Sequence, residues 1–209
     1  IQNCRSTCGA GTWTRLCSDP RSIPRAPSSV EVSVMSIMHL DPAPAVGVLT
    51  ISDRSSDGVR EDVSGPRIVE WCKAREYRVK EYSIVPDETS AIVSLLTQWA
   101  DDGMDLIITT GGTGFTRRDV TPEATRAVLD REAPGIAEEI RRKGLSATPY
   151  SIIARGVAGI RGRTLIVNCP GSPGGVSDSL SVLESVVDHA IALLRGDQAP
   201  HGIGGDDNE

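Results

Sequence analysis

The residues with the clearest chemistry lie in the stretch 106–123, which reads LIITTGGTGFTRRDVTPE. Its first five residues predict a buried strand, which is followed at once by Gly111, Gly112, Thr113 and Gly114. Glycines let the backbone turn tightly and let a ligand approach main-chain N–H groups, which bind oxyanions. Arg117 and Arg118 add positive charge, and Asp119 adds a carboxylate. These residue types suit a phosphate-bearing ligand with a metal ion, although an ordinary glycine-rich turn would contain the same glycines.

Similar residue types follow three other predicted strands. Ser52 and Asp53 follow the run 45–51, Asp87 follows the run 77–85, and the run 164–168 leads to Gly171, Ser172, Pro173 and Gly174. In an open α/β sheet, ligands bind in the crevice outside the carboxyl ends of the strands. We therefore expect these residues to meet the Gly-rich loop and to bind phosphate groups, helped by the N-terminal ends of the following helices.

Asp87 and Asp119 are the expected catalytic and metal-binding pair. Two carboxylates that face phosphate oxygens can hold a divalent cation, which neutralises charge on a transferred phosphoryl group. From spacing alone, a structural role is favoured for each residue: Asp87 is placed to cap a helix, and Asp119 to form an Asx turn. Ser172 has the same alternative as a turn residue.

The hydrophobic pattern predicts the elements that would position these residues. Strands at 45–51, 77–85 and 106–110 alternate with helices at 64–76, 87–100, 121–129 and 136–143, with Ser64 as the cap of the first helix. This alternation indicates a three-layer α/β fold with a mostly parallel sheet. Strands at 151–157 and 164–168 are joined by too few residues for a parallel crossover, so we expect an antiparallel hairpin at one end. A last helix is expected at 176–194.

Three arginines, Arg155, Arg161 and Arg163, are expected on that hairpin as solvated charges. Contact of these side chains with an anionic ligand is the alternative.

Composition restricts the classes of partner. The chain has 209 residues, a net charge of −6 and no basic tract, so a nucleic-acid partner is not indicated. No apolar run reaches the roughly 20 residues of a membrane span. We expect a cytoplasmic protein with one domain at 45–195 and a flexible tail at 196–209. Residues 1–44 lack periodicity and are expected to be either a disordered extension or an upstream translated segment.

The motifs as a set point to a known family. The stretch TTGGTGFTRRDVTPEAT resembles the signature of the molybdopterin-binding family typified by MogA and MoaB, whose domain also occurs in gephyrin. Four further segments match in order, namely GVLTISDR, DVSGPRIVEW, IVPDE and TLIVNCPGSPGG. The resemblance extends from about residue 45 to residue 195.

The resemblance implies a reaction in molybdenum cofactor biosynthesis. ATP and molybdopterin would be the substrates and Mg²⁺ the cofactor of a nucleotidyltransferase that forms adenylyl-molybdopterin and pyrophosphate. The aspartates of the PDE and RD-x-TP motifs serve this chemistry in the family, and Asp87 and Asp119 match them. The implied assembly is a homo-oligomer, a trimer or a hexamer, with a molybdenum insertase as a further partner.

Two alternatives come from the same superfamily. One is a non-catalytic MoaB-like module that binds molybdopterin, for which absence of the aspartate pair would be the sign; both aspartates are present. The other is an insertase, which carries this domain together with additional β-rich domains that we do not expect in this chain.

Overall fold

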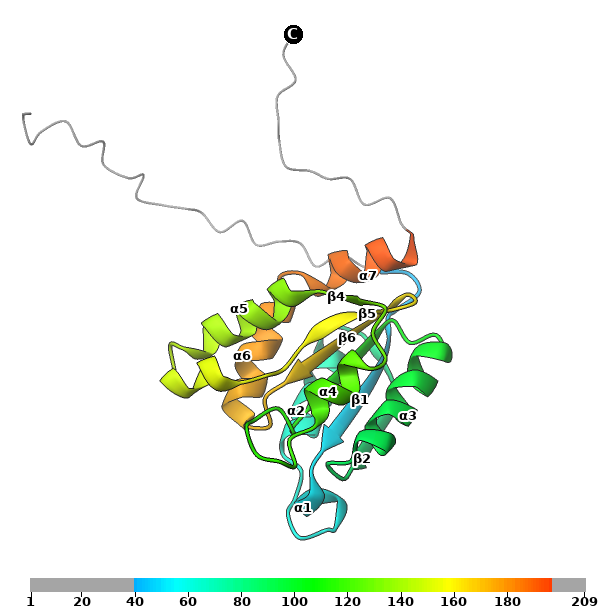
Figure 1. Cartoon of the computed structure of the whole chain (residues 1–209). Coiled ribbons are helices and arrows are strands. Elements are labelled where there is room, and N and C mark those ends of the chain that lie inside the picture. The colour runs from blue at the N-terminus through cyan, green and yellow to red at the C-terminus, as the bar shows by residue number, and fades with distance from the viewer. Residues whose placement is uncertain (1–39, 197–209) are drawn as a thin grey trace, which may run out of the picture. The chain divides into compact units, whose positions relative to one another are not determined.

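The computed structural model of the chain describes residues 40–196, so the predictions for residues 1–39 and 197–209 lie outside the described part. A six-stranded sheet in the order β2-β1-β3-β6-β5-β4 forms its centre (Figure 1). The strands are β1 (Ala45–Ile51), β2 (Arg78–Val85), β3 (Leu106–Thr110), β4 (Arg131–Glu132), β5 (Ala158–Arg161) and β6 (Thr164–Cys169). β2, β1, β3 and β6 run parallel, and β5 pairs antiparallel with both β6 and β4.

The helices cover both faces of this sheet. They are α1 (Asp53–Ser56), α2 (Ser64–Ala74), α3 (Thr89–Asp101), α4 (Thr121–Arg126), α5 (Pro134–Gly144), the 3₁₀ helix η1 (Pro149–Ile153), α6 (Pro173–Leu183) and α7 (Val187–Arg195). Residues of α2, α5, α6 and α7 belong to one buried cluster, and residues of α3 and α4 belong to another. The predicted three-layer, mostly parallel α/β fold is confirmed.

Strand periodicity explains why two cores form. In β1, Val46 and Val48 face the α2 side, whereas Leu49 and Ile51 face the α3 side. β3 alternates in the same way, and all five of its residues are buried. A strand that is covered on both faces is apolar throughout, as its sequence predicted. Gly47 leaves room on the α3 side, because a Cβ there would lie 2.6 Å from the Trp99 ring.

The hairpin prediction was right in topology and wrong in position. The strand predicted at 151–157 is absent: Pro149 begins the 3₁₀ helix η1, where the Thr148 hydroxyl accepts a hydrogen bond from the Tyr150 amide. Of the six residues expected to form the connection, the first four, Ala158–Arg161, are themselves strand β5. Gly162, with φ of +55°, makes the turn that pairs Arg161 with Thr164. Local capping and one left-handed residue therefore shifted the strand along the chain.

The helix predicted at 176–194 is two helices, because the chain breaks between α6 and α7. Ser185 donates its hydroxyl to the Val182 carbonyl at 2.8 Å, a side-chain bond that competes with helix continuation. Val176 and Leu183 before the break and Ile191 after it pack into the same buried cluster. Among the described residues, no helix is both long and apolar enough to cross a bilayer.

Candidate functional site

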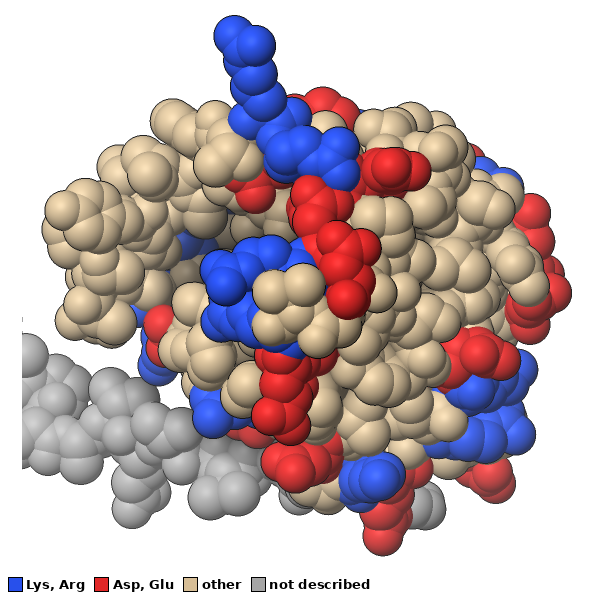
Figure 2. Space-filling view, turned by 90° about the horizontal axis from the view of Figure 1, so that it is seen from below, with Lys and Arg blue, Asp and Glu red and all other residues tan. Residues whose placement is uncertain are grey.

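A cleft of about 390 Å³ lies at the carboxyl edge of the parallel strands. It is bounded by the ends of β1 and β3 and by the loops that precede α2 and α6. Figure 2 views this edge from below and shows acidic and basic side chains next to one another. Such an edge is where ligands bind in open α/β sheets.

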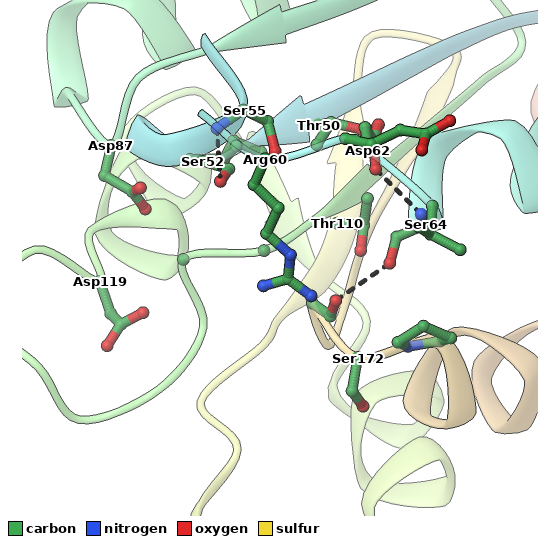
Figure 3. A pocket seen from close by; sticks show the side chains of 17 residues that line it. Thr50, Ser52, Ser55, Arg60, Asp62, Ser64, Asp87, Thr110, Asp119 and Ser172 are labelled. Carbon is green, nitrogen blue, oxygen red and sulfur yellow. Dashed lines mark hydrogen bonds between the residues drawn. The ribbon is translucent and has the colours of Figure 1, made fainter. Parts of the chain in front are cut away.

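The cleft brings together most of the residues that were predicted from the sequence. Its lining includes Ser52, Asp87, Gly111, Gly112, Asp119, Gly171, Ser172 and Pro173 (Figure 3). Four predicted residues do not line it: Asp53, Thr113, Gly114 and Gly174. Thr113 is 6% exposed and borders a separate cavity of about 10 Å³. The Gly-rich loop therefore presents its first two glycines to the cleft.

Gly111 and Gly112 fit where no other residue would. Both have left-handed backbone conformations, with φ of +97° and +59°. A Cβ on Gly111 would lie 2.1 Å from the Ile51 carbonyl oxygen, and one on Gly112 would lie 2.7 Å from Asp87 Oδ1. The loop is also held by Thr121, whose hydroxyl donates to the Gly111 carbonyl at 2.9 Å. The backbone is thus fixed in close contact with the carboxylate that is expected to act.

A reciprocal pair of hydrogen bonds joins the ends of β1 and β2. The Asp53 amide donates to Asp87 Oδ2, the Asp87 amide donates to Asp53 Oδ1, and each bond measures 3.0 Å. Arg118 binds the Asp53 carboxylate with two nitrogens, at 2.9 and 2.6 Å. The Arg118 guanidinium and the Asp87 amide lower the pKa of Asp53. Asp53 therefore stays ionised, its charge is offset by Arg118, and it holds Asp87 through the two reciprocal bonds.

Asp87 has the opposite electrostatic environment. Burial raises the pKa of its carboxyl group, and the nearby charges of Asp53 and Asp119 raise it further. Within residues 40–196, its Oδ1 accepts no hydrogen bond. Asp87 does not cap α3, whose N-cap is Glu88 without a side-chain bond, so the capping alternative for Asp87 is wrong. A partly buried carboxylate among other carboxylates is an environment that favours a bound cation.

Asp119 combines its local role with a place in the cleft. Its Oδ2 accepts a hydrogen bond from the Thr116 amide at 2.7 Å and so closes the turn at 116–119. The Asx turn expected before Thr121 is not formed, because the Thr121 amide donates to the Gly112 carbonyl. Its Oδ1 accepts no bond from the described residues and remains available to a ligand.

The two predicted serines also cap helices. Ser52 Oγ accepts from the Ser55 amide at 3.3 Å, and Ser172 Oγ accepts from the Gly175 amide at 3.1 Å. In each case the hydroxyl proton can still be donated to a ligand in the cleft.

Arg155 is not on the hairpin and is not a solvated charge, which corrects the prediction for this residue. Its guanidinium donates to the Gly114 and Asp119 carbonyls, each at 2.6 Å, and pairs with Glu123. Arg155 therefore ties down the segment that carries Asp119. Arg161, for its part, pairs with Asp101 at 3.0 Å.

Asp62 was not among the predicted site residues, yet it lines the cleft opposite Asp87 and Asp119 (Figure 3). Asp62 Oδ2 accepts from the hydroxyls of Thr50 and Tyr82, each at 2.6 Å, and Oδ1 accepts from the Ser64 and Gly65 amides. Burial alone would raise the pKa of Asp62, but these donors hold it below its usual value. The N-cap residue of α2 is Val63, not Ser64, and the Asp62 carboxylate accepts the first two amides of the helix. An acidic residue just before a helix was the signal available.

Ser64 performs a different task from the predicted cap. Its hydroxyl donates to the Gly171 carbonyl at 3.0 Å and so connects the start of α2 to the loop before α6 (Figure 3).

The donor set fits Mg²⁺ that is shared with a ligand. Within the described part of the chain, no group of three or more His, Cys, Asp or Glu residues is placed to hold a metal ion. Asp53 is occupied by Arg118, which leaves Asp87 and Asp119 with one unbonded oxygen each. Mg²⁺ commonly takes one or two carboxylates and completes its octahedron with water and substrate phosphates. The cleft supplies that set.

Known proteins resemble this chain over most of its described residues. Residues 47–189 match the family described as the probable molybdopterin binding domain. The protein named gephyrin from Dictyostelium discoideum is 39% identical over 187 residues, which cover 84% of this chain and 26% of that protein. The chain thus spans about a quarter of the length of this relative.

Shorter relatives match over most of their own length. A molybdopterin adenylyltransferase from Helicobacter pylori strain J99 is 40% identical over 156 residues, which cover 72% of this chain and 88% of that protein. The crystal structure of the molybdopterin biosynthesis enzyme MoaB from Thermus thermophilus has a TM-score of 0.69 and 50% identity. The match covers 73% of this chain and 96% of the MoaB chain.

Proposed function

This chain belongs to the family of probable molybdopterin binding domains, and we propose that it is a molybdopterin adenylyltransferase of molybdenum cofactor biosynthesis. An oxygen of the terminal phosphate of molybdopterin attacks the α-phosphorus of ATP. A new P–O bond forms, the bond between the α-phosphorus and its bridging oxygen breaks, and pyrophosphate leaves with that electron pair. The nucleophile belongs to the substrate, so the protein's task is positioning and charge stabilisation.

The residues of the cleft suit that task. The Gly112 amide and the hydroxyls of Ser52 and Ser172 offer donors to phosphate oxygens, whereas the Gly111 amide donates to the Cys169 carbonyl. Asp87 and Asp119 would hold Mg²⁺, which supplies positive charge to the phosphates when it is bound. Asp53 and Arg118 keep Asp87 in place, and Arg155 keeps Asp119 in place.

One observation carries the proposal: two carboxylates with unbonded oxygens share a cleft with a glycine loop that no side chain obstructs. A module that only binds the pterin would not need this pair. The test is incubation of the purified protein with molybdopterin and MgATP. Adenylylated molybdopterin and pyrophosphate should form in equal amounts, and absence of both would overturn the assignment.

Transfer is expected to require a divalent cation. ATP phosphates and the carboxylates of Asp87 and Asp119 repel one another, and a cation between them converts repulsion into attraction. Excess chelator should therefore abolish product formation, and added Mg²⁺ should restore it. Full activity in chelator would show that the two aspartates serve another purpose.

We expect a homo-oligomer, with a trimer favoured over a hexamer. Support comes from an exposed apolar patch around η1, the η1 patch, formed by Leu145, Tyr150, Ile152 and Ile153 at 47%, 75%, 69% and 44% exposure. Sedimentation should give the mass of three chains. The double variant Tyr150→Glu, Ile152→Glu should sediment at a lower mass, while Leu193→Glu, on α7, should not change the assembly. A monomeric wild-type protein at micromolar concentration would contradict this expectation.

The cellular setting is part of the same proposal. Adenylyl-molybdopterin would be passed to a molybdenum insertase, and we place the reaction in the cytoplasm. The buried, free thiols of Cys72 and Cys169 are compatible with a reducing compartment.

A further inference from the structure

More negative than positive side chains line the cleft, although the proposed ligands are themselves negatively charged phosphates. Its acidic lining residues are Glu61, Asp62, Asp87 and Asp119, and Arg60 is its single lysine or arginine among the described residues. Arg118 and Arg155 lie nearby but do not line the cleft, and both are bound to protein carboxylates. A phosphorylated ligand would therefore meet one uncommitted guanidinium.

The Arg60 backbone amide is hydrogen-bonded, whereas its guanidinium group is not hydrogen-bonded to any described residue. Its amide donates to the Arg54 carbonyl at 2.9 Å, and Asp62, two residues later, fixes the loop through the hydroxyls of Thr50 and Tyr82. The Arg60 guanidinium makes no hydrogen bond or ion pair within residues 40–196, and Asp62 already accepts four bonds. In Figure 3 the side chain points into the cleft, between Asp87 and Asp119 on one side and Ser64 and Ser172 on the other.

We propose that Arg60 binds a phosphate group of the substrate in this cleft and sets the affinity for phosphorylated ligands. The inference rests on the proposed function for the identity of the ligand and on the cleft's charges for the residue. A guanidinium binds phosphate with two parallel N–H···O bonds. The exposed Arg60 guanidinium lines the cleft and is held by no described residue, so its donors are available for such a contact. The phosphate belongs either to the nucleotide or to the pterin.

The test compares Arg60→Gln with Arg78→Gln by calorimetric titration of the full-length protein. Arg78 is an exposed arginine at the start of β2, at the opposite edge of the sheet, so both variants lose one positive charge. Separate titrations use ATP, inorganic pyrophosphate and molybdopterin, with and without Mg²⁺. Loss of a charge-assisted bidentate contact should raise Kd by about ten- to a hundredfold in Arg60→Gln. Arg78→Gln should change Kd by less than about twofold, as expected for an exposed charge far from the ligand.

The titrations also identify which phosphate is bound. A raised Kd for ATP and pyrophosphate assigns Arg60 to the nucleotide, and a raised Kd for molybdopterin alone assigns it to the pterin phosphate. The Kd of Arg60→Lys should lie between those of the wild type and Arg60→Gln, because lysine keeps the positive charge but cannot donate two parallel hydrogen bonds. Unchanged Kd values for all three ligands, with an unchanged melting temperature, would overturn the inference.

The titrations separate this inference from the proposed reaction. If the wild-type protein forms no adenylylated product while Arg60→Gln still weakens ATP binding, the proposed function fails and the role of Arg60 stands.

Discussion

The Asp119→Asn variant should lose adenylyl transfer by about 10²–10³-fold in kcat, the usual effect of removing one group that stabilises transition-state charge. The amide keeps the size of the carboxylate and can still accept the Thr116 amide bond, so the turn should survive. It cannot supply a negative oxygen for a cation that bridges to phosphate. Binding of molybdopterin should change much less than kcat, because the interaction matters most in the transition state.

Asp102→Asn is the matched control for this variant. Asp102 is exposed at the end of α3, and its side chain makes no interaction with described residues. Steady-state rates and thermal melting of both variants should show loss of turnover in Asp119→Asn alone, with similar melting temperatures. Near-wild-type turnover in Asp119→Asn would reduce the role of Asp119 to its turn.

The Asp87→Asn variant should lose transfer to a similar extent and should not lose stability at neutral pH. Burial raises the pKa of the Asp87 carboxyl group, so the folded state disfavours its charged form. A neutral amide removes that penalty and can still accept the Asp53 amide bond. A residue retained at a cost in stability is typical of functional sites.

The pH dependence of the melting temperature tests whether the raised pKa of Asp87 causes this effect on stability. With a folded-state pKa above its ordinary 3.8, Asp87 contributes stability that is fully present below 3.8 and is lost as pH rises through the raised value. Asp87→Asn should therefore melt at or above the wild-type temperature at neutral pH. The difference should shrink as the pH falls toward 3.8. A variant that melts well below wild type at neutral pH would show that the Asp87 carboxylate stabilises the fold.

Patterns local in the sequence predicted much of the fold. The apolar runs at β1 and β3 specify buried parallel strands, because a strand covered on both faces has no polar side. The glycines after β3 were predicted to lie at a ligand edge, and Gly111 and Gly112 line the cleft there. Local pattern failed at β5, where Pro149 and Gly162 decided the boundaries through capping and turn geometry.

Within the cleft, the sequence by itself determined which residue types stand at the ends of the strands, since parallel strands bring their carboxyl ends to one edge. Only the tertiary structure decided their partners. Arg155 reaches the Asp119 carbonyl across 36 residues, and Arg118 reaches Asp53 across 65. Asp62 is saturated by donors from β1, β2 and α2. These pairings leave no periodic pattern in the sequence, because the order of the strands in the sheet decides which loops become neighbours. The pairings in turn determine which carboxylates remain available to a ligand.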